Sequence, residues 1–282
     1  DVNLSDKKEI QVGGEAVIEG VMMRGPKQIA TAIRRSNGQL EVWKKDFESI
    51  TTKHKILGLP FVRGFVSLIE MMKLGISTLT FSEERASIDW QAEEKAKGNK
   101  IKEKSEKAEK RETILTFIIA FGLAFLLFGF LPYKISDWVG LGKENLYFNL
   151  FAGVIRIIFF VLYVWLISLM KDVKRLFEYH GAEHKTVYAY EGSVNLTADE
   201  IQKFSTLHPR CGTSFMFFVM LVSILVFSIV DTIVSYTTGI FPTVIVRLSY
   251  HMLLIPLVSG ISYEILKLSG KNINHPIVKL MT

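Results

Sequence analysis

Two short clusters of metal-ligating side chains lie close together in the second half of the chain. The first, in the segment EYHGAEHKTVYAYE, contains His180, Glu183 and His184. Residues three and four apart share one face of a helix, so a helix would point these three side chains in one direction. The second, in HPRCGTSF, contains His208 and Cys211, which a turn would bring onto one ion. Together the two clusters predict a metal site.

Zinc is the metal that these residue types predict, because imidazole and thiolate are its preferred protein ligands. Four protein ligands close a structural zinc site, whereas a catalytic site keeps three and leaves one position open. The pattern H-x-x-E-H matches the inverted zincin motif, in which two histidines bind zinc and the glutamate is the general base. The candidate metal ligands are His180, His184, His208 and Cys211.

The ligand count separates two hypotheses for this site. If one candidate ligand stays off the ion, Glu183 is the catalytic base of a hydrolase. If all four bind, the zinc is a structural clip. A third alternative, in which Glu183 is itself a ligand or hydrogen-bonds to a ligating histidine, stays open at this point.

Long apolar blocks position these clusters. The chain has 282 residues, 49% of them hydrophobic, and the apolar residues collect after residue 112 in blocks long enough for membrane spans, which need about 20 residues each. The blocks cover residues 113–135, 146–170, 214–236 and 241–268. The fold class expected is therefore an α-helical integral membrane protein with about four transmembrane helices. Residues 113–282 form the membrane domain, and its loop 171–213 carries the metal site.

Basic residues indicate the orientation of this domain. Lys and Arg precede the first span and follow the second and the fourth, while the loops at 136–145 and 237–240 carry few charges. Because positive residues collect on the cytoplasmic side, both termini and the loop 171–213 are expected in the cytoplasm. The net charge of +6 is explained in the same way and does not indicate nucleic-acid binding. A single cysteine excludes a disulfide within the chain.

Residues 1–55 are expected to form a small β-rich cytoplasmic unit. Asn37-Gly38 is a strong hairpin signal, and GGEAVIEGVMMRGP predicts one strand that ends in a turn at Gly25-Pro26. Two arginines of this unit, Arg24 and Arg34, are candidate ligands for an anionic group.

The next two segments connect this unit to the spans. Residues 56–82 are apolar, but Arg63, Glu70 and Lys73 interrupt them, which favours an amphipathic helix on the membrane surface, with a re-entrant segment or a true span as the alternative. Residues 83–112 are rich in both charges and predict a solvated linker or helix.

Ionisable side chains interrupt the second and the fourth of the predicted spans. Arg156 interrupts the second, and Arg247, His251 and Glu264 interrupt the fourth. Arg247 and His251 are one helical turn apart, and we expect the arginines to join an internal network that fixes helix packing. Glu264 lies near the cytoplasmic end of its span, at the depth of the metal site, and a role as a further ligand or as a partner that hydrogen-bonds to a ligand is left open.

Three motifs together, GGEAVIEGVMMRGP, EYHGAEHKTVYAYE and HPRCGTSF, resemble the bacterial family called domain of unknown function 1385, and the likeness extends from about Gly13 to the C-terminus. The resemblance implies a protein of the bacterial cytoplasmic membrane and a metal-dependent enzyme. It implies metal through the same residues, His180, Glu183, His184, His208 and Cys211. It implies no particular substrate.

The sequence supports two functional hypotheses. The first is a zinc-dependent membrane hydrolase that acts at the cytoplasmic face of the bacterial membrane. The alternative is a non-catalytic, zinc-stabilised membrane scaffold or biogenesis factor that binds a membrane-protein partner of the translocation or ribosome-linked machinery. The lipid bilayer is the expected environment in both, and a homodimer is left open.

Overall fold

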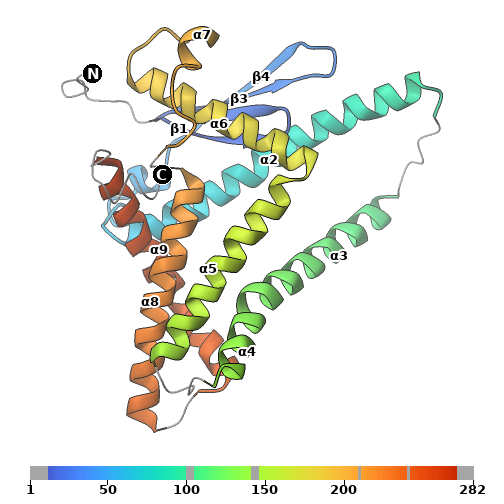
Figure 1. Ribbon diagram of the computed structural model, residues 1–282. Helices are drawn as coiled ribbons and strands as arrows, with labels where there is room; N and C mark the ends of the chain where they lie inside the picture. Colours follow the sequence, from blue (N-terminus) through green and yellow to red (C-terminus); the bar gives the residue numbers. More distant parts are fainter. Residues whose placement is uncertain (1–11, 100–104, 141–145, 209–210, 240–241, 272–282) are drawn as a thin grey trace. The chain divides into compact units, whose positions relative to one another are not determined.

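The computed structural model of the chain describes residues 12–99, 105–140, 146–208, 211–239 and 242–271 (Figure 1). The described chain is mostly helical, with one small antiparallel sheet near its N-terminus. It divides into two compact units. The first, here called the sheet unit, comprises Asp1–Asn99, Ser168–Met216 and Ser259–Thr282. The second, here called the helical unit, comprises Lys100–Ile167 and Phe217–Val258.

The sheet is a four-stranded meander. Its strands are β1 (Gly13–Val17), β2 (Gly20–Arg24), β3 (Gln28–Arg34) and β4 (Leu40–Asp46), and each pairs antiparallel with the next. The hairpin predicted at Asn37-Gly38 is confirmed, because Gly38 turns the chain with a φ of 81° between β3 and β4. The predicted turn at Gly25 is also present, since its N–H donates to the carbonyl of Gln28 at 2.8 Å.

One prediction for this sheet is wrong. The segment GGEAVIEGVMMRGP is two strands, β1 and β2, and they reverse direction at Glu19, which has a φ of 52°. A non-glycine residue rarely adopts a positive φ, so the sequence carries no glycine or asparagine signal at this turn. The two-strand hairpin places Glu19 at a loop tip and Gly14 near the free edge of the sheet.

The core of the sheet unit lies between the sheet and helix α2 (Val62–Ala96), which follows the short helix α1 (Ile50–Lys53). Four strand residues are almost fully buried, and Leu74 and Phe81 of α2 pack against them. The buried four are Val17, Met22, Ile29 and Ile33. Phe81 also stacks on Trp43 with ring centroids 5.4 Å apart.

Polar contacts fasten α2 to the sheet unit over much of its length. Glu70 accepts hydrogen bonds from the Ser49 hydroxyl at 2.7 Å and from the Ile50 N–H at 2.8 Å. Nineteen positions further on, Asp89 forms an ion pair with Arg35 at 2.7 Å. The helix runs without a break past residue 82, where the sequence predicted a boundary between an interfacial helix and a charged linker.

The start of α2 packs against helix α9 (Val244–Lys271), whose last residues belong to the same unit. Arg63 forms a two-pronged ion pair with Glu264, at 2.7 Å and 2.6 Å. A Cβ on Gly64 would lie only 2.8 Å from the Cα of Gly260, so this crossing has no room for a side chain.

Helix α6 (Lys171–Glu191) completes the sheet unit and contacts β1 and β2. The Glu19 carboxylate, at the tip of the β1–β2 hairpin, accepts hydrogen bonds from Arg175 and from the Tyr179 hydroxyl at 3.0–3.1 Å. These contacts hold α6 against the sheet. The short helix α7 (Ala198–Ile201) follows Thr197, whose side chain makes no capping hydrogen bond.

The helical unit contains long apolar helices. They are α3 (Glu106–Phe125), α4 (Leu131–Trp138), α5 (Leu146–Ser168), most of α8 (Gly212–Thr238) and the first half of α9. One turn of π-helix, η1 (Leu126–Phe130), joins α3 to α4. Pro132 follows that turn and lacks the N–H that would otherwise bind the carbonyl of Phe128, four residues earlier. Instead, Arg156 of α5 donates its Nε–H to this carbonyl at 2.9 Å.

A second polar network lies in the same unit. Asp231 of α8 is 1% exposed and accepts hydrogen bonds from Arg247, Tyr250 and His251 of α9. Arg247 thus joins an internal network, and His251, one helical turn away, binds the same carboxylate. Arg247 also donates to Asn149 of α5 at 2.9 Å.

Five described helices are long and apolar enough to cross a membrane, where the sequence analysis expected four. The additional one is α2, which the sequence predicted as an interfacial helix. The five segments are Val62–Ala96, Lys110–Trp138, Tyr147–Ser168, Gly212–Thr238 and Ile245–Ser269.

Candidate metal centre

Helix α6 brings the first predicted cluster together. His180, Glu183 and His184 lie on one face of this helix, as the i, i+3, i+4 spacing predicts. The two imidazole rings have centroids 4.4 Å apart. Glu183 and His184 are buried, with 4% and 6% exposure. This face is therefore turned into the sheet unit.

The second cluster reaches the first through Cys211, the residue that precedes α8. Its sulfur lies 3.1 Å from Nε2 of His180. The candidate ligand atoms of His180, His184 and Cys211 all lie within 4.8 Å of one another. Three zinc ligands around one ion have this order of separation, because zinc–nitrogen and zinc–sulfur bonds are about 2.0 and 2.3 Å long.

A backbone carbonyl fixes the tautomer of His184. Its Nδ1 lies 2.5 Å from the carbonyl oxygen of Thr206. A carbonyl can only accept, so Nδ1 carries the proton and Nε2 of the neutral ring keeps its lone pair. Ligating histidines commonly have this arrangement, in which the second ring nitrogen donates to a carbonyl and orients the ring.

The surroundings of Cys211 favour the thiolate. Burial opposes ionisation, but hydrogen bonds from His180, from His184 when its ring is protonated, and from Thr213 outweigh it and lower the pKa of the thiol to about 5. Thr213 contributes its hydroxyl at 2.8 Å, and its backbone N–H lies 3.4 Å from the sulfur in the first turn of α8. The thiolate is the form that binds metal.

Glu183 lies beside the ligands and against the sheet. Its Oε2 is 3.4 Å from Nε2 of His184. Burial raises the pKa of Glu183, and the nearby histidines oppose this shift only in part. A Cβ on Gly14 would approach the Glu183 side chain to 2.8 Å and the carbonyl oxygen of Met22 to 2.7 Å. Glycine at position 14 therefore makes the space that Glu183 occupies.

His208 lies next to this group without belonging to it. It is 6% exposed, and its ring centroid is 5.6 Å from that of His184 and 4.6 Å from that of Tyr188. Its role as a fourth ligand stays a prediction.

Glu264 is engaged elsewhere in the sheet unit. Both of its carboxylate oxygens bind the Arg63 guanidinium, and the group of converging ligand atoms does not include it. The geometry gives its expected role at the metal no support, and the sequence offered no means of choosing Arg63 as its partner 201 positions away.

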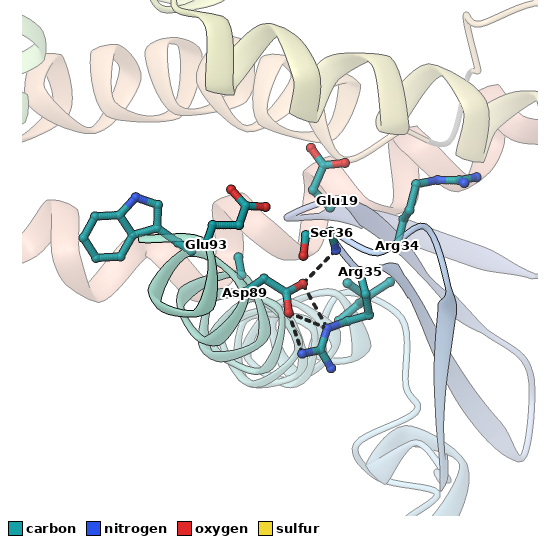
Figure 2. A pocket seen from close by; sticks show the side chains of 9 residues that line it. Glu19, Arg34, Arg35, Ser36, Asp89 and Glu93 are labelled. Atoms are coloured by element: carbon teal, nitrogen blue, oxygen red, sulfur yellow. Dashed lines mark hydrogen bonds and ion pairs between the residues drawn. The ribbon is translucent and has the colours of Figure 1, made fainter. Parts of the chain in front are cut away.

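The two candidate anion-binding arginines lie outside the metal cluster. Arg24 donates to the Met71 sulfur at 2.7 Å and lies over the Phe47 ring. Arg34 is exposed and lines an open pocket between the sheet and α2 (Figure 2). The side chain of Arg34 points away from the ion pair between Arg35 and Asp89 in that pocket.

The same pocket has an acidic balance, which does not favour an anion. Its lining includes three acidic residues, Glu19, Asp89 and Glu93, beside the two arginines. Arg35 is already paired with Asp89 and with Glu41, the latter at 2.5 Å. Anion binding by Arg24 or Arg34 stays a prediction.

Three further contributors to the site were missed from the sequence. They are the carbonyl of Thr206, the N–H and hydroxyl of Thr213, and Gly14. The carbonyl has no signature in the sequence. The other two had a usable signal, because Thr213 follows Cys211 at the start of an apolar helix and Gly14 lies in the first of the three motifs.

Comparisons with known proteins place the chain in a family. Residues 59–282 match the family model described as "Protein of unknown function (DUF1385)", and the chain belongs to this family. It is 30% identical, over 274 residues, to "Uncharacterized protein YqhQ" of Bacillus subtilis (strain 168). That match covers 95% of this chain and 82% of the relative. No solved structure matches the chain. The family expected from the three motifs is thus confirmed.

Proposed function

We propose that the protein is a multi-pass protein of the bacterial cytoplasmic membrane in which α2 lies at the interface and does not cross. Contacts within the sheet unit occupy α2 from Glu70 to Asp89. Only the first two turns, which rise roughly 12 Å at 1.5 Å per residue, precede them. The hydrocarbon core is about 30 Å thick, so this free segment is too short to span it.

The exposed side of α2 has the character that an interfacial helix needs. Several large apolar side chains with exposures of 38–64% recur at intervals of three, four and seven residues along it. They are Val62, Ile69, Met72, Ile76 and Leu79. With α2 at the surface and four spans elsewhere, both termini and the segment 171–213 are cytoplasmic by the positive-inside rule.

At that face we infer zinc-dependent hydrolysis. The observation that carries this proposal is the convergence of three ligand atoms, from His180, His184 and Cys211, beside a buried glutamate. Three protein ligands are the number found in catalytic zinc sites. The Thr206 carbonyl supports the assignment, because it leaves Nε2 of His184 available as a ligand.

The residues divide the chemistry between them. His180, His184 and Cys211 would hold a zinc ion, which would supply a Lewis acid for a carbonyl or phosphoryl oxygen and would lower the pKa of water. Glu183 accepts a proton from the attacking water and returns it to the leaving group, which is the role of a general base and then a general acid. Gly14 keeps the carboxylate in place from the side of the sheet.

The substrates that fit this position are carbonyl or phosphoryl compounds associated with lipid, or peptides that reach the cytoplasmic face. Panels of fluorogenic carboxylic esters, phosphate esters and peptides, presented to zinc-loaded protein in detergent, cover these classes. Zinc content is measured on the same samples, so that loss of metal and loss of catalysis are separated.

The decisive variant is Glu183→Gln. We expect it to keep zinc and to lose roughly 10²- to 10⁴-fold in hydrolysis rate, the usual contribution of a general base. Glu178→Gln is the matched control, because Glu178 is an exposed glutamate on the same helix. Full activity in Glu183→Gln with zinc still bound would refute the hydrolase.

A closed zinc clip in a scaffold is the second candidate, and the position of His208 favours it. Its buried ring lies beside that of His184, with centroids 5.6 Å apart, so it is the nearest additional histidine for a fourth ligand among the described residues. His208→Ala separates the two functions. Retention of tightly bound zinc supports three ligands and the hydrolase, whereas its loss supports the clip and a partner-binding role in translocation or ribosome-linked machinery.

A further inference from the structure

Arg156 lies within the second predicted span, 10 residues after the start of α5. Its Nε–H is held by the Phe128 carbonyl that Pro132 leaves without its helical partner. This contact fixes where the guanidinium lies, between α5 and η1. A neutral carbonyl oxygen does not cancel the positive charge, however, and no described ion pair includes Arg156.

The nearest carboxylate is already shared. Asp231 receives Arg247 on one oxygen and both Tyr250 and His251 on the other, and it is 1% exposed. The positive charge of Arg247 is thereby balanced by the negative charge of Asp231. Arg156 interacts electrostatically with both of them, unfavourably with the arginine and favourably with the aspartate.

A charge count over the described apolar segments of the helical unit leaves one cation in excess. Residues 113–138, 147–167 and 217–258 contain three cations and two carboxylates. These are Lys134, Arg156, Arg247, Asp137 and Asp231. Lys134 and Asp137 lie together near the end of α4, and Asp231 matches Arg247. The excess charge is that of Arg156.

A membrane interior penalises such an excess strongly, and charged residues at membrane depth pair with an opposite charge or mark a ligand site. From this charge balance we propose that Arg156, supported by Arg247, binds the acidic headgroup of a membrane lipid. The proposal rests on the membrane insertion proposed above and does not depend on the hydrolase.

The direction of the two side chains favours a lipid as the source of the oxyanion. Arg247 is three residues, roughly 5 Å, from the start of α9, and Arg156 is roughly 15 Å from the start of α5. Arginine side chains on a helix lean toward its N-terminus. Because α5 and α9 both begin after a loop predicted on the outer side, both guanidinium groups lean toward that leaflet. Arg247, near the start of its helix, can reach the interface in this manner, and Arg156 points toward the same leaflet from a deeper position.

The test compares the full-length protein in phosphatidylcholine vesicles with and without phosphatidylglycerol. Thermal unfolding and native mass spectrometry report stabilisation and retained lipid. We expect phosphatidylglycerol to stabilise the wild type and to be retained by it. Arg156→Met should bind this lipid about tenfold more weakly, as loss of one charge-assisted contact predicts. Lys134→Met, which removes a cation at the end of α4, should behave as the wild type.

A second variant and two controls keep the outcome interpretable. Arg156→Lys keeps the charge and should keep most of the lipid effect, even if Arg156→Met folds poorly. Equal retention of phosphatidylglycerol by the wild type and by both Arg156 variants would overturn the site. Stabilisation by inorganic phosphate in phosphatidylcholine that depends on Arg156 would keep the anion site but refute the lipid. Release of the wild-type protein from membranes by alkaline carbonate would instead refute the proposed insertion.

Discussion

The candidate metal centre of the sheet unit and the arginine network of the helical unit both bury polar side chains, but they have opposite electrostatic characters. The first gathers lone pairs, from two imidazoles, a thiolate and a carboxylate, without a neighbouring lysine or arginine among the described contacts. The second gathers guanidinium groups around one carboxylate. The first cluster is therefore suited to a cation and the second to an anion.

The two clusters also differ in how their parts are supplied. Three of the four groups in the metal centre come from one turn of α6, and the fourth begins the next long helix. The arginine network draws its residues from four elements, η1, α5, α8 and α9. A site built from one helical turn survives small movements between helices, whereas a site built from four helices depends on their packing.

The largest effect is expected from removing a metal ligand. His184→Ala and Cys211→Ala should each lower zinc affinity by at least the roughly 100-fold that loss of a supporting hydrogen bond can cause. Elemental analysis after dialysis against a chelator measures this. His54→Ala, an exposed histidine at the end of α1, should keep the wild-type zinc content. Equal zinc content in the wild type and in all three variants would show that His184 and Cys211 do not bind the metal.

Removal of Arg247 should be the most damaging change in the helical unit. Arg247→Met leaves the carboxylate of Asp231 buried without its cation, which costs about 3–5 kcal/mol. Arg156→Met removes a charge that has no carboxylate of its own and should cost much less. Unfolding in detergent, followed by circular dichroism, ranks the two variants, and the reverse ranking would show that the charges are assigned to the wrong partners.

Substitution of Gly14 tests how closely the sheet supports Glu183. Gly14→Ala introduces a methyl group 2.7–2.8 Å from Met22 and Glu183, and overpacking of this kind costs about 1–3 kcal/mol. Hydrolysis should fall as the carboxylate is displaced. Gly13→Ala is the adjacent control, because a Cβ there meets nothing within 4 Å. If the two variants have equal melting temperatures and equal rates of hydrolysis, β1 does not support the position of Glu183.

The smallest effect is expected at the exposed ion pair between Arg175 of α6 and Glu19 of the β1–β2 turn. A double-mutant cycle of Glu19→Gln and Arg175→Met should give a coupling of about 0.2–1 kcal/mol, since both side chains are well exposed. The hydrogen bond from Arg175 lowers the pKa of Glu19 despite its partial burial. The coupling is therefore complete above the ordinary glutamate pKa and disappears as the pH falls below it. A coupling that stays constant through that acidic range would contradict this assignment.

Local spacing explains why the metal cluster could be predicted. The positions of His180, Glu183 and His184 follow from helical periodicity alone, and the hairpin at Asn37-Gly38 follows from turn chemistry. The turn at Glu19 could not be predicted, because a glutamate with positive φ gives no signal in a sequence. Helix α2 was cut short in the prediction because charges replace apolar residues after Phe81 while helix propensity continues.

Partnerships across long separations were the part that escaped prediction. Asp231 is one carboxylate in an apolar helix and was not singled out, although two residues that were, Arg247 and His251, both bind it. The pairing of Arg63 with Glu264 likewise depends on which helices meet, and periodicity within one helix carries no information on that. Backbone groups such as the Thr206 carbonyl escape for a simpler reason, since every residue has one.

The contact between Arg156 and the Phe128 carbonyl has a consequence for how this sequence can change over time. An alanine at position 132 would restore a backbone donor four residues after Phe128 and displace the guanidinium. A leucine at position 156 would leave the carbonyl without that donor in an apolar setting. Each substitution alone is unfavourable, whereas the two substitutions together restore the helical hydrogen bond and remove the charge. Pro132 and Arg156, 24 positions apart, should therefore be inherited and replaced as a pair when relatives of this chain are compared.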